Sequence, residues 1–218
     1  MRRAEAYDLD DPRAAARPGT ATKAKGEARR REILDTAMTL FSGAGFNRVS
    51  LADIAAEVGI TQAGVLHYFP SKAALLIAVL QEREARNTED KRAREAEGVR
   101  PLDAYVSTLK DNDRRPELVQ LFVILAAEAT AEGHPGHEWF VQRNIDLTQS
   151  MTESVRREID ESKLPPGVDA TVIARWVLGI AHGLGAQWVL DPSFDRAGHV
   201  ELFLNLLEPY LNSPRAQA

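Results

Sequence analysis

A concentrated set of groups able to contact a ligand lies in twelve residues, 61–72, with the sequence TQAGVLHYFPSK. The segment opens with a hydroxyl and an amide, passes through Gly64, and closes with three aromatic rings and Lys72. Amides and hydroxyls form hydrogen bonds with polar edges, and lysine attracts anionic groups such as phosphate. These residue types favour recognition by hydrogen bonding and charge.

A second group of reactive side chains, His134, His137 and Glu138, could suggest a metal site or an enzyme. Pro135 and Gly136 lie between the histidines and place them in a turn, and no third ligand is evident. The chain has no Gly-x-Ser-x-Gly motif, no glycine-rich phosphate loop and no cysteine. We therefore expect no metal, no cofactor and no enzymatic activity.

Composition points to a soluble protein with an aliphatic core. The 218 residues are 44% hydrophobic but only 6% aromatic, enough for one or two domains. The first twenty residues contain acids and lack an apolar run, which argues against a secretory signal. No stretch approaches the roughly 18 consecutive apolar residues that a membrane span needs. With no cysteine, the chain fits a reducing compartment, and we expect it in the cytoplasm.

Charge is divided unevenly along the chain. The whole chain has a net charge of −5, but the segment 13–72 carries nine Lys and Arg against five Asp and Glu. A basic N-terminal part joined to an acidic remainder suggests two functions, one of them the binding of an anion. Chance clustering on a solvated surface explains the charge alone equally well.

Helix signals follow one another from residue 26 onward. Residues 1–22 lack periodicity and predict a disordered arm. Ile33, Leu34, Ala37, Leu40 and Phe41 then recur with the spacing of one helical face, which ends near Gly43 and Gly45. The next segment, SLADIAAEVG, begins with a Ser50–Asp53 capping box and ends at a glycine suited to a left-handed helix terminus.

The remaining segments also predict helices. Thr61 and Ser71 are N-cap residues for a helix of about two turns and for a longer helix that starts at Lys72. Proline and glycine separate further helical blocks, and nothing indicates a β-sheet or an internal repeat. The sequence predicts an all-α fold of about nine helices, the later ones over 101–111, 116–131, 136–163, 169–190 and 196–211.

Two short amphipathic helices joined by a tight glycine turn predict a helix-turn-helix, in which the second helix enters the major groove of DNA. Ala55 is small where the helices would cross, and Val65 would share a core with Ile54 and Phe41. Gly64 costs about 1 kcal/mol of helix propensity relative to alanine. That loss is explained if a side chain there would hold the helix away from DNA.

The run 28–76, above all VSLADIAAEVGITQAGVLHYFPSKAAL, resembles the DNA-binding domain of the tetracycline-repressor (TetR) family of transcriptional regulators. The features that agree include the Leu40-Phe41…Gly45-Phe46 helix end and the His67-Tyr68-Phe69-Pro70-Ser71-Lys72 run. The resemblance implies a DNA-binding domain over 23–72 and a helical ligand-binding and dimerisation domain over 73–213. It places the DNA-contacting residues at Arg48, Ser50, Thr61, Gln62, Ala63, Gly64, Leu66, His67, Tyr68 and Lys72.

These residues divide by role. Gln62 is the candidate for base reading, because its amide can pair with adenine through two hydrogen bonds. Ser50, Tyr68, Lys72 and Arg48 would bind phosphates and set the register. Two positions depart from the family pattern: Leu66 replaces the usual tyrosine and could touch a thymine methyl, and Ala74 leaves the capping box at Ser71 incomplete.

The C-terminal helices contain an apolar pattern with small residues, Gly179-xxx-Gly183-x-Gly185, which indicates close helix packing. By the resemblance, the helices 169–190 and 196–211 form a two-fold dimer interface. The predicted interface residues are Val177, Gly183, Leu184, Trp188, Leu202, Phe203 and Leu206. Ordinary core burial within one chain is the alternative for many of them.

Family members usually hold a small molecule among the central helices. The predicted lining is Phe122, Leu125, Glu128, Trp139, Phe140, Arg143, Leu147, Trp176, Ile180 and His182, with plain burial as the alternative for each. Arg143 could meet a ligand carboxylate or pair with Glu128 or Asp146. The acidic balance of the chain argues mildly against a strongly anionic ligand.

The resemblance therefore implies a homodimeric, sequence-specific regulator that a small molecule releases from a palindromic operator, most simply a repressor. An activator or an effector-independent regulator remains an alternative within the family. A helical ligand-binding protein or enzyme with a vestigial DNA-binding head is the alternative from another class.

Overall fold

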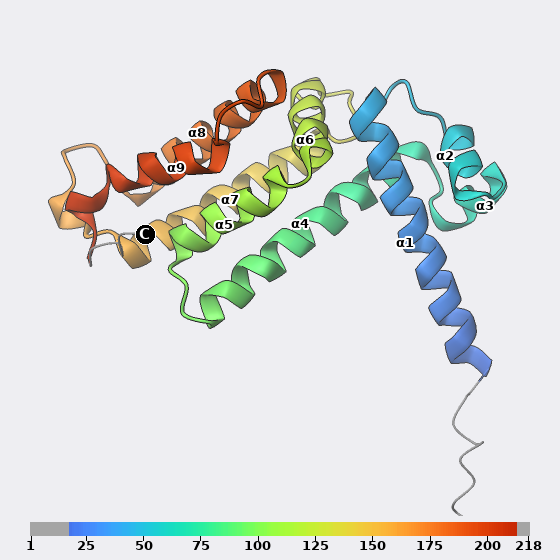
Figure 1. Cartoon of the computed structure of the whole chain (residues 1–218), viewed down its shortest axis with the longest axis horizontal. Helices are drawn as coiled ribbons and strands as arrows, with labels where there is room; N and C mark the ends of the chain where they lie inside the picture. The colour runs from blue at the N-terminus through green and yellow to red at the C-terminus, as the bar shows by residue number, and fades with distance from the viewer. Residues whose placement is uncertain (1–17, 213–218) are drawn as a thin grey trace, which may run out of the picture.

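A computed structural model describes residues 18–212, and the side chains from residue 23 onward. This part of the chain is all-α, as predicted, with nine α-helices and two short 3-10 helices, and α1–α3 lie at one end of a bundle formed by the later helices (Figure 1). The α-helices are α1 (Pro18–Ala44), α2 (Leu51–Val58), α3 (Gln62–Tyr68), α4 (Lys72–Ala96), α5 (Pro101–Asp113), α6 (Pro116–Glu128), α7 (His137–Glu158), α8 (Ala170–Leu190) and α9 (Arg196–Asn205). The 3-10 helices are Glu161–Lys163 and Glu208–Tyr210.

Helix ends differ from the predicted ones by a few residues. α1 begins at Pro18, inside the stretch 1–22 that was predicted to be a disordered arm; the rest of that arm lies outside the described residues. The stretch 136–163, predicted as one helix, is divided at Ile159 into α7 and a 3-10 turn. Ile159 adopts an extended backbone and forms an isolated antiparallel bridge with Leu211.

The caps predicted from the sequence are present. Ser50 Oγ accepts a hydrogen bond from the Asp53 amide at 3.1 Å, and the Asp53 carboxylate accepts one from the Ser50 amide at 2.8 Å. Gly59 closes α2 with φ +73°, a left-handed conformation that glycine adopts without strain. Thr61 Oγ1 then accepts from the Gly64 amide at 3.1 Å and starts α3. These local interactions fix the sharp turn between α2 and α3.

The first hydrophobic core joins the helix-turn-helix to part of the bundle. Phe41 of α1, Ile54 of α2 and Val65 of α3 are each 0% exposed and lie in this core. Leu75, Leu76, Val79 and Leu80 of α4, with Leu121 and Leu125 of α6, belong to the same core. Packing is therefore continuous across residue 72, the predicted domain boundary, and α4 is common to both parts of the chain.

A second core lies within the bundle, among α5, α7, α8 and α9. Val177 and Ile173 of α8 are at most 1% exposed and pack in it with Met151 and Val155 of α7. Within residues 18–212, no single helix is long and apolar enough to cross a membrane; α3 and α4 reach that threshold only when joined across a 56° bend.

Candidate nucleic-acid interface and internal cavity

α3 is supported on one side and open on the other. Val65 is fully buried, and Phe69, the C-cap, is 3% exposed, so both hold the helix against the first core. Gln62, Ala63 and His67 are exposed, and Leu66 is 39% exposed. The open side carries one amide, one imidazole and small groups, which suits close approach of another molecule.

Nothing in the described part of the chain requires glycine at position 64. A Cβ built there would meet its nearest atoms, Ile60 Cδ1 and Thr61 Oγ1, at 3.5 Å, which is ordinary van der Waals contact. The backbone of Gly64 is helical, not left-handed. The fold therefore gains nothing from glycine at this position. The lower helix propensity is explained if another molecule approaches the helix so closely that a side chain there would prevent contact.

The predicted phosphate-binding residues surround the ends of α2 and α3. The Lys72 ammonium lies 4.3 Å from the centre of the Phe46 ring and donates a hydrogen bond to the Asn47 carbonyl at 3.4 Å. Tyr68 packs edge-on against His67, with ring centroids 5.2 Å apart, and is half-buried. Ser50 and Arg48 are exposed beside them.

The Ser50 hydroxyl is already engaged, because it also donates to the Asp53 carboxylate at 2.7 Å. This hydrogen bond, together with that from the Ser50 amide and the charge of Lys72, lowers the pKa of Asp53. Asp53 is therefore ionised at neutral pH. A phosphate bound at Ser50 would have to share the hydroxyl with that carboxylate.

Some basic residues of α1 contact the rest of the helix-turn-helix, and others are exposed without such contacts in the described part of the chain. Arg29 donates to Glu32 at 2.7 Å and to the Val58 carbonyl, the last residue of α2, at 3.5 Å. The Arg30 guanidinium lies 5.2 Å from the centre of the Phe69 ring. These two residues connect α1 to the helix-turn-helix, whereas Lys23, Lys25 and Arg31 are exposed.

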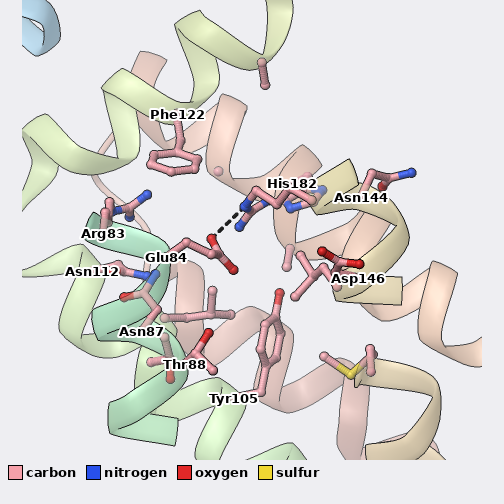
Figure 2. A pocket seen from close by; sticks show the side chains of 18 of the residues that line it. Arg83, Glu84, Asn87, Thr88, Tyr105, Asn112, Phe122, Asn144, Asp146 and His182 are labelled. Atoms are coloured by element: carbon pink, nitrogen blue, oxygen red, sulfur yellow. Dashed lines mark hydrogen bonds and ion pairs between the residues drawn. The ribbon is translucent and has the colours of Figure 1, made fainter. Parts of the chain in front are cut away.

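A cavity of about 740 Å³ lies among α4, α5, α6, α7 and α8, with Arg196 of α9 at its wall. Figure 2 shows its side chains converging from these helices. Six of the ten predicted ligand-binding residues line it: Phe122, Trp139, Phe140, Arg143, Leu147 and His182.

The other four predicted ligand residues lie elsewhere. Leu125 is fully buried in the first core, and Ile180 packs against the second. Glu128 lies near His134, with Oε2 and Nε2 3.6 Å apart, and Trp176 is 48% exposed on the outer surface. Helical periodicity placed all four on apolar or mixed faces but could not tell which face borders the cavity.

Arg143 forms an ion pair, but its partner is neither Glu128 nor Asp146, the two residues that were predicted. Its Nε donates to Glu84 of α4 at 2.7 Å, the dashed line in Figure 2. The predicted partner Asp146 instead accepts from the Gln142 amide at 2.8 Å. Because α7 packs across the cavity from α4, Arg143 reaches over it instead of pairing along its own helix.

Sequence reasoning missed the polar wall of the cavity on α4 and α5. It comprises Arg83, Glu84, Asn87, Thr88, Tyr105, Thr108 and Asn112, with Arg196 from α9. The highly charged second half of α4 resembled a solvated helix. A signal was present, since 83, 84, 87 and 88 have the i, i+1, i+4, i+5 spacing of one helical face.

Burial alters the pKa of two groups in the cavity lining, Tyr105 and His182. It raises the pKa of Tyr105 to about 12, so the phenol stays protonated. Although His182 is open to the cavity, burial by surrounding protein, and then the positive charge of Arg143, lower the pKa of its imidazole. Both groups are therefore neutral at neutral pH, and both can form hydrogen bonds.

An exposed apolar face runs along α8 and α9. Leu202 is 62% exposed, Leu206 72%, and Leu190 88%. Large exposed apolar patches usually mark sites of interaction with another molecule. No atom lies within 4 Å of a Cβ built at Gly179 or Gly183. These two glycines thus pack against nothing in the described part of one chain, although the sequence pattern had indicated close packing.

The predicted dimer residues occupy different environments. Gly183, Leu202 and Leu206 are exposed on this face, and Leu184, Trp188 and Phe203 are half-buried. The prediction of Val177 as an interface residue is wrong, because its side chain is 0% exposed and lies in the second core. It lies one residue from exposed Trp176, so the rotation of α8 decides which of the two faces outward.

The paired histidines lie where the α6–α7 connection meets the helix-turn-helix. The His134 ring packs edge-on against Phe46, with centroids 5.7 Å apart. His137 Nδ1 is 2.8 Å from the Ala129 carbonyl. In residues 18–212, no group of three His, Asp or Glu side chains could hold a metal ion. The side chains of His134 and His137 thus have structural contacts: His134 packs on the Phe46 ring, and His137 interacts with the Ala129 carbonyl.

Comparison with known proteins agrees with this architecture. A family model described as "Bacterial regulatory proteins, tetR family" matches residues 33–79, which are α2, α3 and the adjoining parts of α1 and α4. The regulator TtgR of Pseudomonas putida is 26% identical over 192 residues, covering 84% of this chain and 91% of TtgR.

Solved structures share the fold over most of the chain. The SmeT–triclosan complex superposes with a TM-score of 0.71 at 20% identity, covering 87% of this chain and 96% of that one. A protein from Saccharomonospora viridis, described as a transcriptional regulator and crystallised with choline, gives a TM-score of 0.67 at 21% identity, over 86% and 100%. The capped helix-turn-helix is therefore a DNA-binding domain of the tetR family of bacterial regulatory proteins, and the described chain as a whole shares the fold of solved transcriptional regulators.

Proposed function

We propose that this protein is a homodimeric repressor that binds a palindromic operator and leaves it when a small molecule enters the cavity. Residues 23–72 would form the DNA-binding domain, and 73–213 the ligand-binding and dimerisation domain. The observation that carries the proposal is α3 itself: a two-turn helix, held from behind by Val65 and Phe69, whose open side has a glycine that the fold does not need.

In the proposed complex, α3 lies in the major groove. Gln62, at the first turn, would read a base edge, with Thr61, Ala63, Leu66 and His67 beside it. Lys72, held over Phe46, would bind a phosphate near the end of the helix.

One helix of this length reads few bases, so two copies are needed for a specific site. The apolar face with Leu202 and Leu206 supports pairing through α8 and α9, because bringing two such faces together would remove it from water. Gly179 and Gly183 leave room for a partner helix to come close. A two-fold pair would present its α3 helices about 34–36 Å apart, one turn of DNA.

Release would operate through α4. Its first turns lie in the core that supports α3, and four residues farther along line the cavity: Arg83, Glu84, Asn87 and Thr88. A ligand that displaces α4 would change the spacing of the two α3 helices, for which a coupling of about 1–3 kcal/mol suffices. The S. viridis protein and SmeT, crystallised with choline and triclosan, support an effector role for the cavity.

The proposal is tested by selecting binding sites from random DNA with the purified protein, followed by footprinting on DNA that flanks its gene. A palindrome with half-sites one helical turn apart is the expected result. Selection of no sequence, or of a single half-site, would contradict the dimeric operator-binding function.

Replacing Gln62 with alanine is expected to relax specificity at one base position in each half-site, by about 1–3 kcal/mol of discrimination. Lys72→Ala should instead weaken binding to all sequences alike and lower the salt slope by about one per protomer. Titration of a panel of operator variants at several salt concentrations separates the two effects. Identical profiles for both variants would contradict the assignment of roles.

Replacing Gly64 with alanine is expected to separate stability from DNA binding. The added methyl group meets only ordinary contacts, so the protein should gain up to about 1 kcal/mol of helix propensity. Operator affinity should fall, because the methyl group faces the groove. Thermal unfolding and operator titration of the same preparation test this, with Ala63→Gly as the matched reverse change. Unchanged affinity in Gly64→Ala would mean that α3 does not approach DNA at this point.

A further inference from the structure

The cavity contains a buried cation without an ionic partner in the described part of the chain. Arg83 of α4 is 8% exposed, and its Nε has no hydrogen-bond partner among those residues. Its guanidinium stacks on Phe122, with Cζ 4.0 Å from the ring centre, and Figure 2 shows it directed under that ring into the cavity. A buried arginine is normally paired, because removing its charge from water is unfavourable.

The other buried arginine of the cavity, Arg196, and the half-buried Arg143 are both paired. Arg143 donates to Glu84 at 2.7 Å, and Arg196 donates to Asp113 at 2.7 Å through Nε. Glu84 follows Arg83 in the chain, but its carboxylate is directed to Arg143. The whole lining has five lysine and arginine side chains and two carboxylates. Lys91, Arg143 and Arg196 are neutralised by Glu95, Glu84 and Asp113, so Arg83 is the buried cation of the described lining that lacks a carboxylate partner.

Burial, and next the charge of Arg143, lower the pKa of Arg83 to about 9, so the group is still charged at neutral pH but destabilised. An anion beside the guanidinium would remove that penalty and gain a hydrogen bond to a charged donor. Asn87, about one helical turn from Arg83 on α4, and Asn112 of α5 also line the cavity and can donate further hydrogen bonds (Figure 2).

The wall next to Arg83 fits a flat apolar group. Phe122, Trp139 and Phe140 form a cluster in which each ring meets the others edge-on, with centroids 4.9–6.1 Å apart. All three line the cavity. Such rings bind aromatic bodies by the same edge and face contacts.

We propose that the effector is an organic anion, a carboxylate on an aromatic body, whose carboxylate binds Arg83 while its rings pack on the Phe122–Trp139–Phe140 cluster. The inference rests on the proposed effector role of the cavity and names the chemical class of ligand. It also predicts that a cationic ligand such as choline, found with the S. viridis protein, is excluded here.

Three probes of similar shape test the charge preference: naphthalene-acetate, naphthalene-acetamide and naphthyl-ethylammonium, each titrated calorimetrically into the full-length protein. The acetate is expected to bind at least about tenfold tighter than the amide, from one charged hydrogen bond, and the ammonium not at all. Equal affinity for acetate and amide, tighter binding of the ammonium, or no binding of any probe overturns the inference.

Variants assign the preference to Arg83. Arg83→Met, which keeps the packing on Phe122, should bind acetate and amide equally and should unfold at the same or a higher temperature, since an unpaired buried charge is gone. Arg83→Lys should restore part of the preference. The control is Arg86→Met, one turn away on α4, where the arginine is exposed and paired with Glu82. A merely structural Arg83 would give the opposite result, lower stability with the preference for acetate retained.

Operator titration in the presence of each probe distinguishes this inference from the proposed function. If acetate binds through Arg83 but operator affinity stays constant, the ligand class holds and effector-driven release fails. If the amide or ammonium binds and releases operator, release holds and the anion inference fails.

Discussion

Replacing both Leu202 and Leu206 with glutamate is expected to convert the protein to monomers and to reduce operator affinity by roughly 100-fold or more. Both side chains are largely exposed in one chain, so the folded protomer loses little by the change. In the proposed dimer they lie in an apolar interface, where unpaired carboxylates are strongly unfavourable. Loss of the partner removes the second half-site contact and its avidity. Sedimentation analysis and operator titration measure the two effects.

The matched control is Val141→Glu with Ile145→Glu. These residues are 48% and 53% exposed on α7, a helix outside the proposed interface. The control should stay dimeric and bind operator normally. If the Leu202/Leu206 variant remained a dimer with full affinity, pairing through this face of α9 would be wrong.

Replacing Phe41 with alanine is expected to destabilise the first core by about 3–5 kcal/mol. The ring is 0% exposed and packs against Phe46, with centroids 5.6 Å apart, in the core that supports α3. The cavity left behind would loosen α1, α3 and α4 together, so DNA binding should fall along with stability. Chemical denaturation followed by far-UV circular dichroism gives the change in unfolding free energy.

Leu40→Ala is the comparison for this change, because Leu40 is the preceding residue of α1 and is only partly buried against the same core. It should lose clearly less stability than Phe41→Ala. Equal losses would mean that the effect comes from helix α1 as a whole and not from the buried ring.

The helix-turn-helix was predictable because its signals are local. The helix caps involve residues only a few positions apart: the Ser50–Asp53 capping box, Gly59 at the end of α2, and Thr61 at the start of α3. Such short-range interactions can be recognised from the sequence alone. The apolar spacing that placed Phe41, Ile54 and Val65 in one core has the same local origin, since each helix has one face to bury. The start of α1 was harder to locate, because its first turns have little apolar periodicity.

The cavity and the apolar face were less predictable because they depend on how helices are rotated against one another. α8 has apolar residues around most of its circumference, so periodicity could not decide that Val177 faces inward and Trp176 outward. The ion pair between Arg143 and Glu84 joins residues 59 positions apart. Only the arrangement of the helices in the bundle, with α7 across the cavity from α4, brings these residues together, and the sequence contains no separate sign of it.

α4 has neither proline nor glycine between Lys72 and Ala96, and its two halves have different neighbours. A straight helix of this length measures about 37 Å at about 1.5 Å per residue. If the protein is the ligand-released repressor proposed above, genetic screens should find in this one helix both variants that no longer respond to the ligand and variants that no longer silence a promoter. They should appear in separate blocks, with failure to respond to the ligand from Arg83 onward and loss of silencing before it.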